Sequence, residues 1–299
     1  MNKSVTATPI PGRHAHTTLT AVTRRLARPA RWLAIAAIAT VLAATATGTI
    51  SAHAVATATR PSLAAQPGSA DAMTAAAALP LKGKIVGIDP GHNGRNHDYP
   101  GYLAQQVWNG REWEDCDTTG TQTDGAHTYT EALFNFRVAS YLKADLLKDG
   151  AKVVMTRPNN KGRGPCVNKR AFILNHAHAN VAVDIHADGA YCGGCRGFAL
   201  LEPVADGPND RVIRSSRTFG SDIKAAMLAL KRMPVSNYDG TKGISYRDDL
   251  AGLNLTKVPK ILIEFGNMKN AADVKLLTSP TFQQQIARVL LNAIVKFLK

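Results

Sequence analysis

Apolar residues recur in two alternating patterns from about residue 84 onward. Short apolar runs, each typical of a buried strand, cover 84–89, 151–156, 181–186, 197–202, 243–247 and 260–265. Longer segments with apolar residues at helical spacing cover 130–149, 169–179, 211–230 and 281–299. Because such strands and helices alternate along the chain, we predict a single α/β domain. Its sheet would be mixed, mostly parallel and twisted, of about six strands, with helices on both faces.

A long polar segment, 93–127, separates the first predicted strand from the first predicted helix. Thr128 or Thr130 could cap that helix, and Gly150 ends it. Loops of this length inside a compact domain are uncommon and often functional. We therefore expect the segment to border the binding cleft, as a lid or a regulatory element. The simpler alternative is a surface loop that is held in place through Cys116.

Residues 1–54 have the order of features found in secretory signal peptides. Residues 1–31 carry six basic and no acidic side chains, and an apolar run from Trp32 to about Ile50 precedes an Ala-x-Ala pattern at 52–54. We predict a cleaved signal peptide over 1–54. An uncleaved membrane anchor is the alternative, since the run is about long enough to cross a bilayer. The pair Arg24-Arg25 leaves twin-arginine export open.

The composition changes again after this segment. Residues 55–80 are rich in Ala, Thr, Pro and Ser and nearly uncharged, which is typical of a flexible spacer. Residues 81–299 are long enough to bury one core, and we predict that they form the single folded domain.

The formal net charge of the chain is +14 at pH 7. Without residues 1–54, 30 basic and 22 acidic residues remain, which gives +8. A nucleic-acid-binding role would need this excess in a patch with a matching motif, and because the sequence has neither, we expect no nucleic-acid partner. An exported basic protein suits an anionic polymer, although a basic surface that only serves solubility explains the charge equally well.

Four cysteines, Cys116, Cys166, Cys192 and Cys195, follow the predicted signal peptide, so they belong to a compartment in which disulfides form. Four cysteines allow three connectivities. The spacing Cys192-Gly-Gly-Cys195 would also fit a redox motif or half of a zinc knuckle, but no second Cys-x-x-Cys follows and no helix is predicted to begin there. We favour structural disulfides, with 116–166 and 192–195 as the simplest pairing.

Four residues that are far apart in the sequence are predicted to meet at one edge of the sheet. His92, His186 and Glu264 close predicted strands, and Glu131 opens the first long helix. In α/β sheets, sites form at the carboxyl ends of the strands. Two imidazoles and one carboxylate are the ligand set of a catalytic zinc with one open position, and a second carboxylate can act as general base.

Taken singly, most of these residues have simpler explanations. A histidine after a strand is usually a hydrogen-bonded turn residue, and the helix dipole favours Glu131 in a first turn. Glu264 is harder to explain otherwise, because it ends an apolar strand, where an unpaired charge is costly. Asp89 or Asp184 could orient a histidine ring, and the sequence leaves open which. We expect the remaining histidines of the domain to be structural or exposed: His97, His127, His176 and His178.

Several short segments occur in a recognisable order. They are Ile88-Asp89-Pro90-Gly91-His92, Glu131 with its helix, 150–157, Lys169-Arg170-Ala171, Ile185-His186-Ala187-Asp188 and 258–266. In this order and spacing the chain resembles the zinc-dependent N-acetylmuramoyl-L-alanine amidases, the amidase type 3 family of peptidoglycan hydrolases, from about Lys84 to Leu298. It departs from the family at Asp188, where Asn is common, and in the Cys192–Cys195 loop, which concerns the substrate subsites rather than the proposed ligands.

The resemblance implies that one Zn²⁺ is bound by His92, Glu131 and His186, with Glu264 as the catalytic general base. It also implies hydrolysis of the amide bond between N-acetylmuramic acid and the L-alanine of the peptidoglycan stem peptide. Peptidoglycan or its muropeptide fragments would be the partner of a monomer that is secreted or periplasmic, at the cell wall. We expect no stable membrane partner after cleavage of the signal peptide.

Two alternatives share much of this picture. One is a zinc carboxypeptidase-like or deacetylase-like enzyme that acts on wall fragments with the same metal chemistry. The other is an inactive wall-binding homologue, and the presence of Glu264 beside all three proposed ligands speaks against it. The sequence holds neither a Gly-x-Ser-x-Gly elbow nor a Gly-x-Gly-x-x-Gly fingerprint after a strand, which argues against a serine hydrolase and a dinucleotide enzyme.

Overall fold

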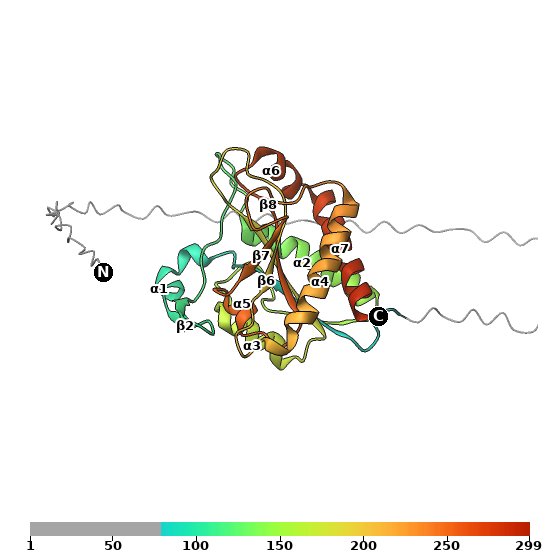
Figure 1. Ribbon diagram of the computed structural model, residues 1–299. Helices are drawn as coiled ribbons and strands as arrows, with labels where there is room; N and C mark the ends of the chain where they lie inside the picture. Colours follow the sequence, from blue (N-terminus) through green and yellow to red (C-terminus); the bar gives the residue numbers. More distant parts are fainter. Residues whose placement is uncertain (1–78) are drawn as a thin grey trace, which may run out of the picture. The chain divides into compact units, whose positions relative to one another are not determined.

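The computed structural model of the protein describes residues 79–299 (Figure 1). The predicted signal peptide, 1–54, and nearly all of the predicted spacer, 55–80, lie outside the described residues. The described chain folds around a six-stranded sheet. In spatial order its strands are β4 (Lys152–Met155), β1 (Ile85–Pro90), β5 (Val181–Asp188), β8 (Lys260–Asn267), β6 (Ala199–Pro203) and β7 (Ile244–Arg247).

The sheet is mixed and mostly parallel, which confirms the predicted fold class. Strands β4, β1, β5 and β8 pair in parallel, β6 joins β8 antiparallel, and β7 runs parallel to β6. The chain leaves β1 for β4 on one side and then returns to β5 on the other, so the strand order reverses between β1 and β5. Ligands of open α/β sheets bind at the carboxyl ends of the strands at such a point.

Three long helices cover one face of the sheet. They are α2 (Glu131–Lys148), α4 (Ile213–Leu230) and α7 (Pro280–Leu298), and α7 packs against both of the others (Figure 1). The main apolar core lies between these helices and the strand residues that point toward them, such as Ile88, Val183 and Ile263. Because strand side chains alternate between faces, the residues between these apolar positions point to the other side of the sheet.

The opposite face is covered more thinly. Helix α3 (Val167–His176) and the short helix α5 (Ala251–Asn254) lie over two smaller apolar clusters there. Helices therefore cover both faces, as predicted, but unequally. The thinner cover leaves room on this face for polar side chains and for a cleft.

Local sequence sets the two ends of α2. The hydroxyl of Thr130 accepts a hydrogen bond from the backbone N–H of Leu133 at 3.3 Å, so the cap is Thr130 rather than Thr128. Gly150 follows the helix with φ of +87°, a conformation that favours glycine. This cap makes Glu131 the first residue of the helix, at the end that faces the carboxyl edge of the sheet.

The segment 93–127 is more structured than the predicted loop. It contains a 3-10 turn at Asn96–Asp98, the short helix α1 (Pro100–Leu103) and a hairpin of β2 (Gln106–Trp108) and β3 (Trp113–Asp115). Each of these elements has three or four residues, which is too short for a hydrophobic period to appear in the sequence. Helices α5, with four residues, and α6 (Ala271–Leu277), with seven, were also missed, because both are shorter than the window in which a helical period is recognised.

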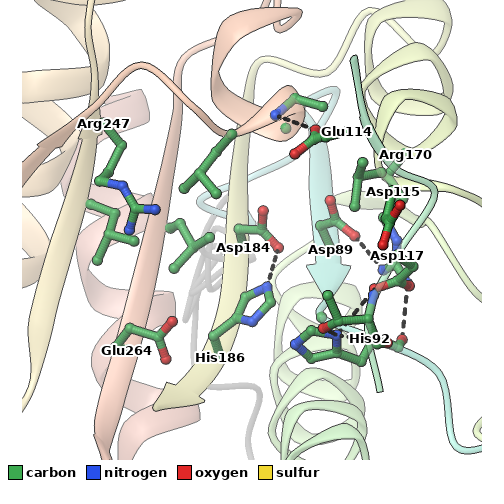
Figure 2. Close-up of a pocket in the computed structure, with 18 residues that line it drawn as sticks. Asp89, His92, Glu114, Asp115, Asp117, Arg170, Asp184, His186, Arg247 and Glu264 are labelled. Carbon is green, nitrogen blue, oxygen red and sulfur yellow. Dashed lines mark hydrogen bonds and ion pairs between the residues drawn. The ribbon is translucent and has the colours of Figure 1, made fainter. Parts of the chain in front are cut away.

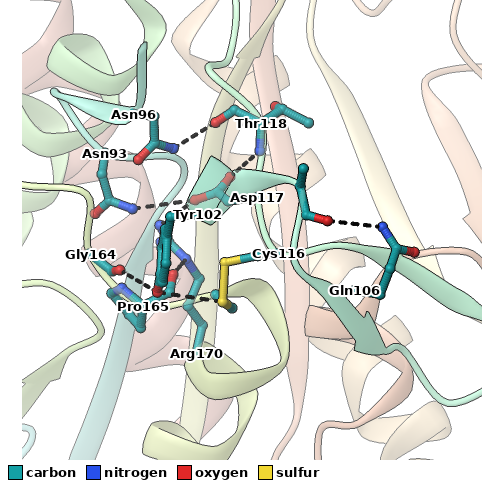
Figure 3. Close-up of a disulfide and its surroundings, with 12 residues drawn as sticks. Asn93, Asn96, Tyr102, Gln106, Cys116, Asp117, Thr118, Gly164, Pro165 and Arg170 are labelled. Atoms are coloured by element: carbon teal, nitrogen blue, oxygen red, sulfur yellow. Dashed lines mark hydrogen bonds and ion pairs between the residues drawn. A yellow bond between two sulfur atoms is a disulfide. The ribbon is translucent and has the colours of Figure 1, made fainter. Parts of the chain in front are cut away.

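The cysteines pair in the simplest of the three connectivities, as Cys116–Cys166 and Cys192–Cys195. Cys116 follows β3 and is fully buried, and Cys166 is the residue before α3 (Figure 3). The first disulfide therefore ties the end of the hairpin segment to the helix on the thinly covered face. The next residue after Cys116, Asp117, is brought to a fixed place beside the sheet.

Candidate metal and catalytic site

The structure brings together His92, Glu131 and His186. The Nε2 atom of His92 lies 3.2 Å from Oε2 of Glu131, and Nδ1 of His186 lies 2.8 Å from Oε1 of the same carboxylate. One ligand atom from each residue lies within 4.8 Å of the other two, a group that could hold a metal ion. The three side chains come from the turn after β1, the first turn of α2 and strand β5.

The turn after β1 is shaped by a close approach of the two histidines. Their ring centroids are 5.0 Å apart, and a Cβ atom on Gly91 would overlap the His186 ring. Glycine at position 91 is therefore needed for the imidazoles to meet. His92 itself has φ of 53°, a left-handed conformation that is uncommon for residues other than glycine and often marks functional sites.

Glu264 lies beside this group on the neighbouring strand. His186 of β5 is paired with Glu264 of β8, so both side chains point to the thinly covered face (Figure 2). The sequence predicted that both residues close their strands, and this detail was wrong, because β5 continues to Asp188 and β8 to Asn267. The Oε2 atom of Glu264 is buried and has no hydrogen-bond partner among residues 79–299.

Each histidine is oriented by an aspartate on its far ring nitrogen. Nδ1 of His92 lies 3.1 Å from Oδ1 of Asp117, and Nε2 of His186 lies 3.5 Å from Oδ1 of Asp184 (Figure 2). The sequence left open whether Asp89 or Asp184 would do this, and the structure selects Asp184 for His186. Asp117 was missed, because it lies in the segment 93–127, where no periodic pattern marks it.

A buried ion-pair network connects the two aspartates. Arg170 contacts Asp117 at 3.2 Å and Asp89 at 2.9 Å, and Lys260 contacts Asp184 at 3.2 Å and Asp89 at 2.9 Å. All five side chains are buried, and Lys260 is fully so. Because buried charges are stable only when they are paired, Asp89 holds both cations and, through them, both histidine partners.

Arg157 fixes the turn after β1 to helix α2 through hydrogen bonds, and it forms no ion pair with any residue of 79–299. Its guanidinium donates to the backbone oxygens of Pro90 at 2.9 Å, Gly91 at 3.3 Å and Ala132 at 2.8 Å. The side chain is 1% exposed. Gly91 precedes His92, and Ala132 follows Glu131. Arg157 therefore sets the distance between His92 and Glu131.

The charges around Glu131 and Glu264 shift the pKa values of these two glutamates in opposite directions. Burial alone would raise the pKa of Glu131, but the imidazoles of His92 and His186 outweigh burial and hold this pKa well below its usual value. Burial raises the pKa of Glu264 to about 8, an effect that His186 opposes and the charges of Glu131 and Asp188 strengthen. Glu131 is thus a fixed anion, whereas Glu264 exchanges a proton near neutral pH.

The histidines respond to the same charges. Burial would lower the pKa of His92, but Glu131 and Asp117 together raise it to about 9. Burial would likewise lower the pKa of His186, and its hydrogen bonds to Asp184 and Glu131 raise it well above the usual value. In the absence of a cation the cluster therefore holds protons on its imidazoles, and a cation bound there would have to displace them.

The site opens into a cavity of about 300 Å³, the main cleft, on the thinly covered face (Figure 2). His92, His186 and Glu264 line it together with Arg247 of β7 and Glu114 of β3. The hairpin segment thus borders the cleft, as expected. Whether it moves as a lid stays a prediction. The other histidines of the domain are exposed, also as expected: His97, His127, His176 and His178.

Fold and site together define an α/β domain with a mixed sheet, in which a His–Glu–His group and a half-buried glutamate meet at one sheet edge. The model of the N-acetylmuramoyl-L-alanine amidase family matches residues 86–296. The chain therefore belongs to the N-acetylmuramoyl-L-alanine amidase family, a family of enzymes that is generally zinc-dependent.

Relatives and solved structures agree with this assignment. The chain is 36% identical to an N-acetylmuramoyl-L-alanine amidase of Mycobacterium tuberculosis over 235 residues, which covers 76% of this chain and 92% of the relative. The crystal structure of the amidase Ami1 from Mycobacterium smegmatis superposes with a TM-score of 0.67 at 35% identity, covering 73% of this chain and 98% of that one. The apo form of Ami1 from Mycobacterium abscessus gives 0.64 at 36% identity, covering 73% and 100%.

Proposed function

We propose that this protein is a zinc-dependent peptidoglycan hydrolase that cleaves the amide bond between N-acetylmuramic acid and the L-alanine of the stem peptide, with Glu264 as general base. The observation that carries the proposal is the pairing of His186 with Glu264 across β5 and β8. This register sets the Glu264 carboxylate beside the group of His92, Glu131 and His186, which supports its proposed role as proton acceptor.

The residues present fit a zinc ion. Two imidazole nitrogens and one carboxylate are a common set of protein ligands at catalytic zinc sites, and they leave a position for water and substrate. Each imidazole also has an aspartate on its far nitrogen, as metal-binding histidines commonly do. When bound there, Zn²⁺ would polarise the scissile carbonyl and lower the pKa of water.

Glu264 would carry the proton through the reaction. Its Oε2, which has no hydrogen-bond partner among residues 79–299, is free to accept a proton from the attacking water, and the carboxyl would then return that proton to the departing amine of L-alanine. Asp117 and Asp184 hold the imidazoles in one orientation, so the cluster does not have to reorganise during the reaction. The oxygen of the water ends in the new lactyl carboxyl group, and the peptide leaves with a free amino terminus.

Cell wall amidases are typically extracellular or wall-associated. We infer that this protein is exported through a signal peptide at 1–54, that 55–80 is a spacer, and that 81–299 acts as a monomer. Within residues 79–299, no helix combines the length and apolar character needed to cross a bilayer. N-terminal sequencing of the exported protein and sedimentation of the purified protein test these inferences.

Mass spectrometry of the products tests the reaction. The purified protein with zinc should split N-acetylmuramoyl-L-alanyl-D-isoglutamine into N-acetylmuramic acid and a dipeptide that begins with L-alanine. Trimming at the carboxyl end of a longer stem peptide would instead indicate a carboxypeptidase, and loss of acetate would indicate a deacetylase. Dialysis against a chelator should abolish the cleavage, and added Zn²⁺ should restore it.

A further inference from the structure

The site has a second opening that differs from the main cleft. A cavity of about 400 Å³, the side pocket, is lined by residues that follow His92 and flank Glu131, and Arg247 does not line it. Below, His92, Glu131 and His186 are called the metal-ligand group. A smaller cavity joins the two regions, because it shares Gly120, Thr121 and Gly189 with the side pocket and is also lined by Glu131, His186 and Glu264. A substrate that spans the site can therefore extend into both openings.

The linings of the two openings have different chemistry. The main cleft carries Glu114, Asp115 and Arg247. The side pocket is lined by neutral hydroxyl and amide side chains: Asn93, Thr119, Thr121, Gln122 and Thr130. Its cation, Lys269, is already paired with Asp124 at 2.8 Å. His97, the other titratable side chain of the lining, lies 3.1 Å from Asp98, so the side pocket offers mainly neutral hydrogen-bonding groups.

An exposed aromatic ring stands at the edge of the side pocket and is held in place. Tyr191 is 77% exposed, yet its hydroxyl donates to Oδ1 of Asp124 at 3.0 Å, and Nζ of Lys269 lies 4.7 Å from its ring centroid. The residue before it is fixed through a hydrogen bond from Asn267 to the Ala190 oxygen at 2.8 Å. The residue after it begins the Cys192–Cys195 disulfide.

This arrangement matches the surface of a sugar ring. A pyranose has a face of C–H groups that packs on an aromatic ring and a rim of hydroxyl and acetamido groups that bond to neutral polar side chains. Because Tyr191 is immobilised in advance, stacking on its open face costs little conformational entropy. Charged stem-peptide groups suit the main cleft better, since acidic and basic side chains line it.

We propose that the side pocket is a glycan subsite, in which Tyr191 stacks on an N-acetylated amino sugar of the substrate while the stem peptide extends into the main cleft. This inference rests on the proposed function, because it assumes that the scissile amide lies between the two openings. It adds a direction for the substrate and names Tyr191 as a specificity residue outside the metal-ligand group.

Binding of a peptide-free tetrasaccharide of N-acetylglucosamine and N-acetylmuramic acid tests the inference without hydrolysis. In calorimetry, Tyr191→Ala should weaken binding about 10-fold or more, whereas Tyr191→Phe should weaken it less than threefold, because the ring remains. Phe172→Ala is the matched control: Phe172 is also an exposed aromatic residue, at 55%, but lies on α3 outside both openings, and its variant should bind as wild type does. Equal binding by Tyr191→Ala and wild type would overturn the glycan subsite.

Kinetics separate this inference from the proposed function. With polymeric glycan substrates, Tyr191→Ala should raise KM about 10-fold with kcat and zinc content unchanged, and with a single-sugar muramoyl dipeptide the effect should be smaller. Hydrolysis by wild type with no change in Tyr191→Ala on any substrate would keep the function and reject the subsite. Tyr191-dependent tetrasaccharide binding by a protein that cleaves no muramoyl amide would reject the function and keep the subsite.

NMR tests the stacking itself. In wild type, the tetrasaccharide should shift the NMR signals of the Tyr191 ring, and unshifted signals at saturation count against stacking.

Discussion

The two glutamates of the site differ in how their charge is compensated. Glu131 lies where β1, α2 and β5 meet, and Glu264 lies on the neighbouring strand β8. Both carboxylate oxygens of Glu131 contact an imidazole, at 2.8 and 3.2 Å, and its pKa is held low. Glu264 has a buried oxygen that is unpartnered among the described residues, and its pKa rises to about 8. Glu131 is the more deeply buried of the two, yet its pKa is the lower, so its partners rather than its burial make the difference.

This difference teaches how one sheet edge can hold a cation and move a proton at the same time. A carboxylate that helps to bind a cation must stay charged, and both oxygens of Glu131 contact imidazoles that are themselves paired with Asp117 and Asp184. A carboxylate that exchanges a proton near neutral pH must be free to become neutral. Substitutions on either side should therefore have separable effects on metal affinity and on the rate of hydrolysis.

Replacing the charged glutamate should have the largest effect. We expect Glu131→Gln to reduce zinc affinity at least 100-fold and to abolish measurable hydrolysis, because the anion that neutralises the cation is lost. Metal content after gel filtration and a competition titration with a chromophoric chelator measure the affinity. Glu202→Gln is the matched control, since Glu202 is also a buried glutamate of the sheet, 3% exposed, but lies outside the cluster. Full zinc retention by Glu131→Gln would contradict the ligand assignment.

Replacing the unpartnered glutamate should separate rate from binding. We expect Glu264→Gln to lower kcat about 10²- to 10⁴-fold while zinc affinity changes less than a few-fold, because the amide cannot accept the proton of the water. Turnover of a muramoyl dipeptide and the same chelator titration give both quantities. If this variant hydrolyses as fast as wild type, Glu264 is not the general base.

The sequence predicted the positions of His92, His186 and Glu264 better than it predicted the contacts of Glu131. His92, His186 and Glu264 follow apolar runs, so their common sheet edge could be derived from periodicity and from the α/β pattern. Glu131 could be placed at a helix start. Its contact with both imidazoles, however, depends on the turn at Gly91 and on the hydrogen bonds that Arg157 donates to backbone oxygens. These are contacts between segments that are distant in sequence, and no local pattern encodes them.

The supporting network was the part that periodicity could not reveal. Lys260 stands at the head of an apolar strand and is buried because Asp89 and Asp184 neutralise it, which becomes visible when β1, β5 and β8 lie side by side. Asp117 reaches His92 because the Cys116–Cys166 disulfide fixes its segment against α3 (Figure 3). Short elements and tertiary ion pairs carry no hydrophobic period. Sequence reasoning therefore recovered the sheet and named Asp184 as one candidate to orient a histidine, but missed Asp117 and the cations that hold both aspartates.

Removing Asp89 from the ion-pair network should destabilise the site around Glu131 without a direct change at Glu264. We expect Asp89→Asn to lower the free energy of unfolding by about 3–5 kcal/mol, because Arg170 and Lys260 each lose a buried partner. Zinc affinity should fall about 10-fold through the displaced histidine partners. Denaturant titration and chelator competition measure the two effects. Asp98→Asn, which removes a more exposed pair with Arg95, should cost less than about 1 kcal/mol, and equal losses in the two variants would argue against the network.

The smallest effect concerns the pH dependence of stability in the metal-free protein, and it should have opposite signs at the two glutamates. The pKa of Glu264 is about 8 in the folded state against 4.5 for an ordinary glutamate, so the folded state binds the extra proton and wild type loses stability as pH rises from about 5 to 8. Glu264→Gln has no charge to bury, so its stability relative to wild type should rise over that range.

Glu131 gives the reverse dependence in a lower window. Its folded-state pKa lies below the ordinary value, so it contributes stability above about pH 4.5 that is lost as pH falls through the folded-state pKa. Glu131→Gln should therefore lose stability relative to wild type at neutral pH and approach it in acid. Urea titrations of both variants and wild type between pH 3 and 8.5 measure these differences. If the free energies of unfolding of the two variants change with pH in parallel, the charges of Glu131 and Glu264 are not compensated differently. Only unequal compensation of the two carboxylates makes these slopes diverge.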